Sequence, residues 1–77
     1  MALREKYVKA LTIIGYKEIK RTPKYIVFKG VSQNFYVGKV ALRIGNTSAS
    51  SIPASKVMKA KLIAIAERGY PEPLVVA

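Results

Sequence analysis

The amino-acid sequence predicts an α+β fold, in which a helix, an antiparallel meander of about three strands and a second helix follow one another. Apolar residues recur at helical spacing near both ends of the chain, and short β-branched and aromatic runs fill its middle. A glycine follows each helical stretch. The chain has 77 residues, so we expect one small basic domain over residues 1–77. Two helices on one face of the sheet would make it a two-layer structure.

The first helix is expected to end at Ile14. Gly15 directly follows the apolar stripe, at the position where helices commonly end with a left-handed residue. Tyr16 can then fold back as the apolar contact of that ending. The stripe consists of Leu3, Tyr7, Ala10, Leu11 and Ile14.

Beyond Gly15 the apolar period changes to two residues, which is typical of strands. The candidate strand segments are residues 17–21, 25–28, 35–37 and 40–44. The second of these is the strongest signal, whereas the first alternates only weakly. Residues 22–24 form a turn or an irregular link between the first two segments, because Pro23 cannot donate a hydrogen bond to a sheet.

Gly38 and Lys39 leave two interpretations open. Glycine at the first central position of a two-residue loop suits a type II′ hairpin turn, and Val37 would then lie opposite Val40. In that register Tyr36 lies opposite Ala41, and Phe35 lies opposite Leu42. Alternatively, Gly38 marks a bulge in one long strand. We prefer the hairpin.

The second helix is expected to follow a loop at residues 45–51, whose small and polar composition predicts that it is exposed. Ser51 or Ser55 is its candidate N-cap, and Pro53 its candidate first-turn residue. Gly69 ends it, and the apolar segment 74–76 then docks on the core or adds an edge strand. The apolar stripe of this second helix consists of Met58, Leu62, Ile65 and Ala66, and Val57 and Ile63 widen it.

Charge is the strongest functional signal in the sequence. Fourteen Lys and Arg stand against four Glu, with no Asp, which gives a formal net charge of +10 at pH 7. Such an excess destabilises a compact domain through self-repulsion unless an anionic partner offsets it. Nucleic acid is the commonest polyanion, so we expect DNA or RNA as the partner.

The same composition argues against an enzyme and against a metal site. The chain has no His and no Cys, and its four Glu are not spaced as a catalytic pair on one element. We therefore expect neither catalysis nor a cofactor. No stretch approaches the roughly 20 apolar residues of a membrane span, so we expect no membrane partner and a cytoplasmic location, in the host cell if the source is viral.

The basic residues predict a surface that contacts phosphates with little sequence preference. Lysines in the first turn of the second helix oppose its dipole, which favours an anion at that end. If about six phosphates of duplex DNA are contacted, affinity should fall several hundredfold to a thousandfold or more between 50 and 200 mM salt. The candidate contact residues are Lys17, Lys20, Arg21, Lys24, Lys39, Arg43, Ser51, Lys56, Lys59 and Lys61, with Lys29 beside them.

Four aromatic residues lie in the predicted strands, namely Tyr25, Phe28, Phe35 and Tyr36. Most of them are needed for the core of so thin a sheet, but exposed ones could stack on single-stranded nucleic acid. Strand alternation places Tyr25 with Val27 on one face and Ile26 with Phe28 on the other. One of these pairs is expected to be exposed unless the domain associates, and an exposed pair would be either a stacking platform or a protein–protein interface.

Two resemblances add to this interpretation. Ser55 and Lys56, with Ala60 and Lys61, resemble the basic second helix of the double-stranded RNA-binding domain, whose order is also helix, three strands, helix. Val57 stands where that family has a lysine. Residues 24–28, 35–39 and 41–45, followed by spaced serines, are similar to small uncharacterised proteins of bacteriophage origin. That second resemblance implies a phage or mobile-element source and no particular activity.

The sequence therefore predicts a non-enzymatic nucleic-acid-binding protein. The main alternative is a small phage-encoded inhibitor that binds an acidic or nucleic-acid-binding surface of a host protein, because electrostatic steering serves that role as well. A third hypothesis is an oligomeric role, in which an exposed strand face pairs between copies.

Overall fold

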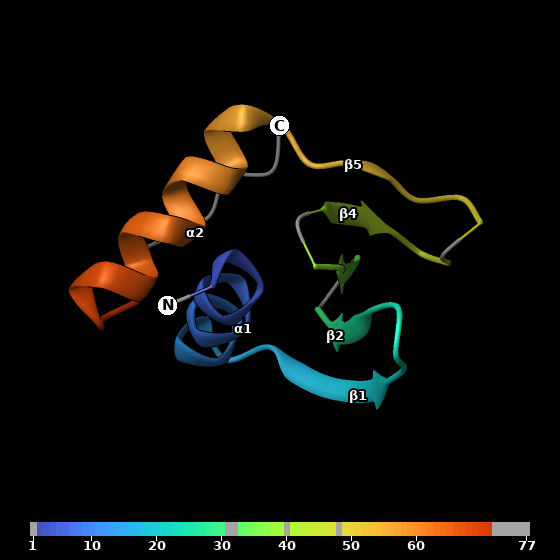
Figure 1. Cartoon of the computed structure of the whole chain (residues 1–77), viewed down its shortest axis with the longest axis horizontal. Coiled ribbons are helices and arrows are strands. Elements are labelled where there is room, and N and C mark those ends of the chain that lie inside the picture. The colour runs from blue at the N-terminus through green and yellow to red at the C-terminus, as the bar shows by residue number, and fades with distance from the viewer. Residues whose placement is uncertain (1, 31–32, 40, 48, 72–77) are drawn as a thin grey trace.

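The chain folds into a helix, an antiparallel meander and a second helix (Figure 1). The computed structural model describes residues 2–30, 33–39, 41–47 and 49–71. Its elements are α1 (Leu3–Ile14), β1 (Lys17–Arg21), β2 (Ile26–Lys29), β3 (Asn34–Val37), β4 (Leu42–Gly45), β5 (Ile52–Pro53) and α2 (Lys56–Arg68). The α+β class is confirmed. The expected count of about three strands is wrong, because the sheet has five strands in the order β1-β2-β3-β4-β5.

The two edge strands explain this difference: β1 matches the weakly alternating candidate segment 17–21, and β5 was not among the candidate segments. Every residue of β1 is exposed, so β1 lacks the apolar alternation that marks a half-buried strand. β5 is only two residues long and contains Pro53, which the sequence placed in the first helical turn. That placement is wrong. An edge strand accepts proline, because one side of its backbone has no neighbouring strand to pair with.

α1 ends as its sequence predicts. Gly15 adopts a left-handed conformation with φ of 107°, and its N–H donates to the carbonyls of Leu11 and Thr12 at 3.2 and 3.1 Å. The N–H of Tyr16 donates to the carbonyl of Leu11 at 3.0 Å. The Tyr16 ring then meets the Phe35 ring edge-on, with 5.1 Å between centroids. The glycine thus ends the helix and turns the chain onto the sheet.

The sheet has two chemically different faces, which the strand register defines. Residues that pair across neighbouring strands point to the same face. The inner face carries apolar residues of the core, namely Ile26, Phe28, Phe35, Val37, Leu42 and Ile44. The outer face carries Lys17, Lys20, Val27, Lys29, Asn34, Tyr36, Arg43 and Pro53. The alternation expected for β2 is confirmed, since Val27 points away from Ile26 and Phe28.

A bulge in β1 changes which of its residues share a face. Lys17 pairs with Lys29 and Lys20 pairs with Val27, so the register shifts between Glu18 and Lys20. The extra residue in this step is Ile19, which is 55% exposed. Because of this insertion, Lys17 and Lys20 both belong to the outer face. In a regular strand, residues three apart would point to opposite faces.

β3 and β4 form a hairpin, as preferred from the sequence, but in a different register. Val37 pairs with Leu42, Tyr36 with Arg43 and Phe35 with Ile44. The N–H of Gly38 donates to the carbonyl of Ala41, and Gly38 has no positive φ, so the expected type II′ turn at Gly38 is wrong. The shift equals two residues along β4. A shift of two preserves the face of every side chain, which is why alternation alone could not distinguish the registers.

α2 begins after β5 and buries the predicted stripe. Ser55 is its N-cap, and the Ser55 hydroxyl accepts a hydrogen bond from the N–H of Met58 at 3.1 Å. Gly69 ends α2 in a left-handed conformation, as predicted. Val57 is 66% exposed, so its expected place beside the stripe is wrong, whereas Ile63 packs against the core. The buried residues are Met58, Leu62, Ile65 and Ala66.

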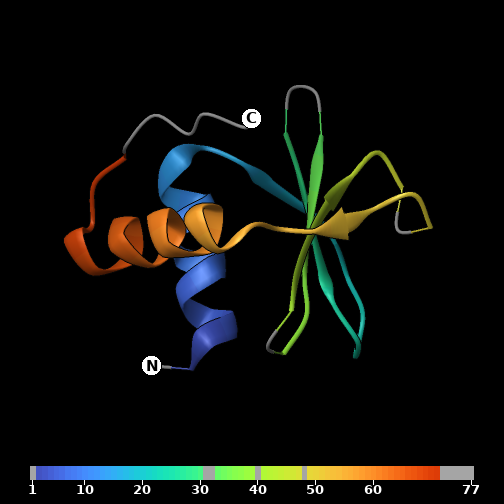
Figure 2. The ribbon, with the colours of Figure 1, turned by 90° about the horizontal axis from the view of Figure 1, so that it is seen from above.

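Both helices lie on the same side of the strands (Figure 2). α1 packs against α2 and also contacts β1 and β3. Tyr7 and Leu11 of α1 join Leu62 and Ile65 of α2 in one cluster with the inner face. The segment 74–76, expected to dock or to add a strand, lies outside the described residues. Within the described part of the chain, neither helix has the length and apolarity needed to cross a membrane.

Candidate functional site

Four of the fourteen Lys and Arg residues lie on the outer face of the sheet, opposite the face that packs into the core. Lys17, Lys20, Lys29 and Arg43 belong to this face by strand register, and all four are exposed. No Glu among the described residues belongs to it. The outer face therefore carries positive charge that no described carboxylate on the same face compensates.

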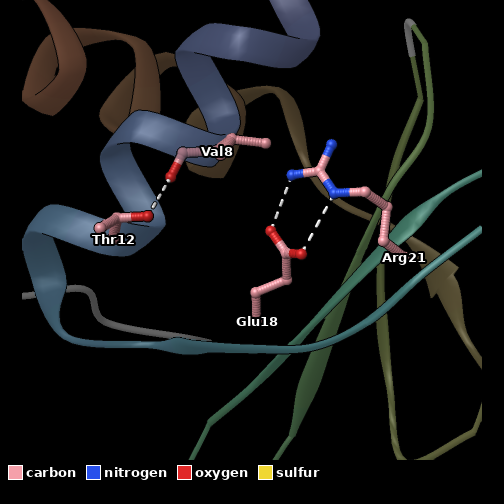
Figure 3. Close-up of polar contacts among 4 residues, drawn as sticks. All are labelled: Val8, Thr12, Glu18 and Arg21. Carbon is pink, nitrogen blue, oxygen red and sulfur yellow. Dashed lines mark hydrogen bonds and ion pairs between the residues drawn. The ribbon is translucent and has the colours of Figure 1, made fainter.

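The described carboxylates lie instead on the inner face or on the helices. Glu18 pairs with Phe28 in the register, so it belongs to the inner face, as does Arg21, which pairs with Ile26. Glu18 accepts two hydrogen bonds from the Arg21 guanidinium, at 2.8 Å from Nη2 and 3.2 Å from Nε (Figure 3). This hydrogen-bonded ion pair holds the pKa of Glu18 below its ordinary value.

The other two described carboxylates belong to the helices. Glu67 of α2 forms an ion pair with Lys6 of α1 at 3.8 Å. Glu5 of α1 lines a hollow of about 390 Å³ together with Arg4, Val8, Lys9, Arg21 and Ile26. The negative charges of the described chain thus compensate cations on α1 and on the inner face. They leave the outer face strongly basic.

A second hollow, of about 300 Å³, lies on the outer face. Two exposed cations, Lys24 and Arg43, flank it, and the small residues Gly38 and Ala41 leave room within it. Its full lining is Lys24, Tyr25, Tyr36, Gly38, Ala41, Arg43 and Ser51. We call it the tyrosine pocket.

Arg43 is held in place by the loop that precedes β5. Its Nε donates to the hydroxyl of Ser51 at 2.8 Å, and its Nη2 donates to the backbone carbonyl of the same residue. Ser51 is only 5% exposed, although the sequence placed it in an exposed loop. That expectation is wrong, and the helix N-cap is Ser55. Ser51 instead orients the guanidinium beside the tyrosine pocket.

The four aromatic residues of the strands divide into two pairs. Phe28 and Phe35 belong to the core, where most of the strand aromatics were expected. Tyr25 and Tyr36 meet edge-on at the outer face, with 5.8 Å between ring centroids and 73° between ring planes. Tyr36 is almost fully buried, whereas Tyr25 is partly exposed. Of the pair Tyr25 and Val27, then, only the tyrosine is accessible, because Val27 is 5% exposed.

The structure brings together some of the predicted contact residues and separates others. Lys17, Lys20 and Arg43 share the outer face, and Lys24 and Ser51 line the tyrosine pocket. Lys39 follows Gly38, a pocket residue, and is exposed. Arg21 belongs to the inner face. The remaining three, Lys56, Lys59 and Lys61, lie on α2.

Two features of this site have no signal in the local sequence. One is the bond between Arg43 and Ser51, which are eight residues apart and meet only because β5 returns beside β4. The other is the bulge at Ile19, since nothing around that residue in the sequence marks it. Both depend on how neighbouring strands pair.

Comparisons with protein-family models, with curated proteins and with solved structures found no match to this chain. The two resemblances drawn from the sequence therefore remain predictions. Among the described residues, no group of three or more His, Cys, Asp or Glu is placed to hold a metal ion.

Proposed function

We propose that this protein is a non-enzymatic nucleic-acid-binding domain that contacts phosphates with the outer face of its sheet. The proposal treats the fold as two layers, in which the helices cover the inner face and the opposite face meets the partner. One observation carries it: Lys17, Lys20, Lys29 and Arg43 share a face on which no described carboxylate lies. A polyanion on that face would offset the self-repulsion of the +10 chain.

The chemistry of these side chains supports binding with little sequence preference. Lysine ammonium groups act as mobile point charges toward phosphate oxygens, and such contacts position a nucleic acid without distinguishing its bases. Arg43 differs, because Ser51 already holds its guanidinium through Nε and Nη2, so the charge it offers to a phosphate has a fixed direction. Neutralised phosphates release their counterions, so the affinity should decrease steeply with salt.

The test compares two triple variants that remove the same charge. Lys17, Lys20 and Lys29 are changed to alanine together in one variant, and Lys56, Lys59 and Lys61 in the other. Each variant has a formal net charge of +7, three less than the natural +10. Binding of labelled duplex DNA, duplex RNA and single strands is measured by fluorescence anisotropy between about 50 and 200 mM salt.

The outer-face variant should lose much more affinity than the α2 variant at every salt concentration. On duplex DNA its plot of log affinity against log salt should be shallower by about 2.7, since each lost phosphate contact removes about 0.9 from the slope. Equal losses in the two variants would show that net charge acts without a particular face.

Absence of binding at low salt would overturn the proposal. Retention of one stoichiometric acidic protein from nuclease-treated lysate, together with that absence, would favour the inhibitor hypothesis. Sedimentation of the free protein measures its oligomeric state and so tests the hypothesis of an oligomeric role.

A further inference from the structure

We infer that the nucleic acid bound by the outer face is single-stranded, and that one unpaired base stacks on Tyr25 in the tyrosine pocket. The inference rests on the proposed function and names the substrate class of the same surface. Three observations carry it: the partial exposure of Tyr25, the residues that line the pocket, and the charges around it.

Tyr25 is an aromatic residue that the core does not use. Neither Tyr25, which directly precedes β2, nor Tyr36 of β3 belongs to the core cluster, which takes Phe28 from β2 and Phe35 from β3. Tyr36 is buried and meets Tyr25 edge-on, so it limits how the Tyr25 ring can turn. Tyr25 also follows a turn in which Thr22 bonds with it in both directions. The Thr22 hydroxyl accepts from the Tyr25 N–H at 3.0 Å and donates to the Tyr25 carbonyl at 2.9 Å.

The tyrosine pocket has the composition of a site for a flat, polar ring. Tyr25 and Tyr36 supply aromatic surface, and Gly38 and Ala41 add no bulk. Arg43 is tied to Ser51 through Nε and Nη2, so its Nη1 group is available to a ligand, and its direction is already set. A base on Tyr25 would therefore find both a stacking surface and a positioned donor.

The cations continue from this pocket across the sheet. Lys20 in β1 and Arg43 in β4 belong to the same row of paired residues, together with Val27 and Tyr36. Three strand spacings separate the two cations, which is about 14 Å. A single-stranded backbone that crosses the strands along this row meets a cation at each end, and Tyr25 lies beside the row, against Tyr36.

A duplex fits this arrangement poorly. Its bases are stacked and paired inside the helix, so a base could enter the tyrosine pocket only after it had been unstacked. A single strand has unpaired bases that can be placed on an aromatic ring without that cost. DNA and RNA strands share this chemistry, so the experiment includes both.

The chain contains no Trp, which allows a direct test. The Tyr25→Trp variant carries one tryptophan at the proposed stacking position. Titration with oligodeoxythymidine and with oligouridine should quench its fluorescence, whereas a blunt duplex of mixed sequence should have little effect. Tyr70→Trp is the matched control, because Tyr70 is 55% exposed and lies just beyond α2. Its fluorescence should not respond.

Removal of the ring should weaken single-strand binding alone. Tyr25→Ala is expected to lower affinity for oligodeoxythymidine or oligouridine roughly five- to hundredfold, the range measured when one base–aromatic stack is lost. Its salt dependence should not change, because no charge is lost. Tyr70→Ala should bind like the natural chain, and circular dichroism verifies that each variant is folded.

The outcomes separate this inference from the proposed function. Suppose that the outer-face lysines matter but Tyr25→Ala binds single strands normally and Tyr25→Trp is not quenched. The stacking inference is then wrong and the proposed function stands. Tighter binding of the duplex than of both single strands would also overturn the inference. If no nucleic acid binds at low salt, both the stacking inference and the proposed function are wrong.

Discussion

Arg43 and Ser51 show how one buried polar residue can fix the orientation of an exposed charged side chain. The guanidinium is accessible, yet two of its nitrogens already donate to Ser51. A side chain held in this way loses less conformational freedom when it binds a ligand than a free lysine does. Arg43 should therefore contribute more to binding than any single lysine of the outer face.

The Ser51→Ala variant tests whether Ser51 orients the Arg43 guanidinium, and it removes no charge. The variant should bind oligodeoxythymidine severalfold more weakly, with an unchanged salt slope, because the Arg43 guanidinium keeps only its bond to the backbone carbonyl of residue 51 and becomes more mobile. The free energy of unfolding should fall by about 1.5–3 kcal/mol, since the variant loses a hydrogen bond from a buried hydroxyl to a charged group. Anisotropy and urea denaturation measure the two effects. Arg43→Lys, which keeps the charge but loses the fork, should show a similar loss of affinity. Normal binding by both variants would contradict the argument.

Glu18 offers a second test at a single residue, through its pKa. Arg21 lowers that pKa, so the ion pair stabilises the fold at and above the ordinary pKa of Glu. This contribution is lost as the pH falls through the lowered folded-state pKa. In the Arg21→Gln variant the pKa of Glu18 should rise toward the ordinary value, as measured by NMR titration of its side chain.

Lys20→Gln is the control for that titration. Lys20 also lies on β1 but belongs to the outer face, so its removal should shift the pKa of Glu18 much less than removal of Arg21 does. Equal shifts in the two variants would mean that general charge, and not the hydrogen-bonded pair, lowers the pKa.

At the scale of single elements, the helices follow local rules and the strands do not. Gly15 and Gly69 end the two helices with positive φ, and Ser55 caps the second. These are features that adjacent residues specify, so they could be predicted. The bulge in β1, the register between β3 and β4 and the strand at Ile52–Pro53 depend on pairing partners elsewhere in the chain. The sequence-based interpretation was wrong or silent on each of them.

Gly15→Ala should reveal the importance of the left-handed helix end. A Cβ atom on Gly15 would meet nothing within 4 Å, so any loss of stability comes from the backbone conformation alone. We expect a loss of about 1–2 kcal/mol in the free energy of unfolding, the usual cost of a left-handed conformation for a residue with a side chain. Urea denaturation measures it.

Gly38→Ala is the matched comparison for that experiment. Gly38 has no positive φ, and a Cβ atom there would meet its nearest neighbour, the Ala41 carbonyl oxygen, at an ordinary distance of 3.5 Å. Its substitution should change stability little. A loss as large as that of Gly15→Ala would show that φ is not the cause.

For the molecule as a whole, the excess positive charge should make stability depend on salt. Ions screen repulsion between exposed charges that lie more than a Debye length apart, about 10 Å at 0.1 M. The free energy of unfolding should therefore rise with sodium chloride between about 20 and 200 mM, because self-repulsion weakens as screening increases.

Urea denaturation at a series of salt concentrations measures this trend. Comparison with the variant in which Lys17, Lys20 and Lys29 are alanine shows how much of the salt dependence comes from the outer face. That variant should depend less on salt, because it carries three fewer charges on the outer face. Stability that falls with salt in the natural chain would show that attractive ion pairs dominate over repulsion.

The residue pattern by itself determined where both helices end, which four residues form the buried stripe of α2 (though not the exposure of Val57), and that Ile26 and Phe28 face away from Val27. It also determined the charge excess. Each of these follows from composition or from residues a few positions apart. Only the tertiary structure decided which cations share a face, which carboxylates lie apart from them, and which tyrosine stays accessible. Those results depend on strand register, on one bulged residue and on a loop that returns to Arg43, and long-range pairing sets all three.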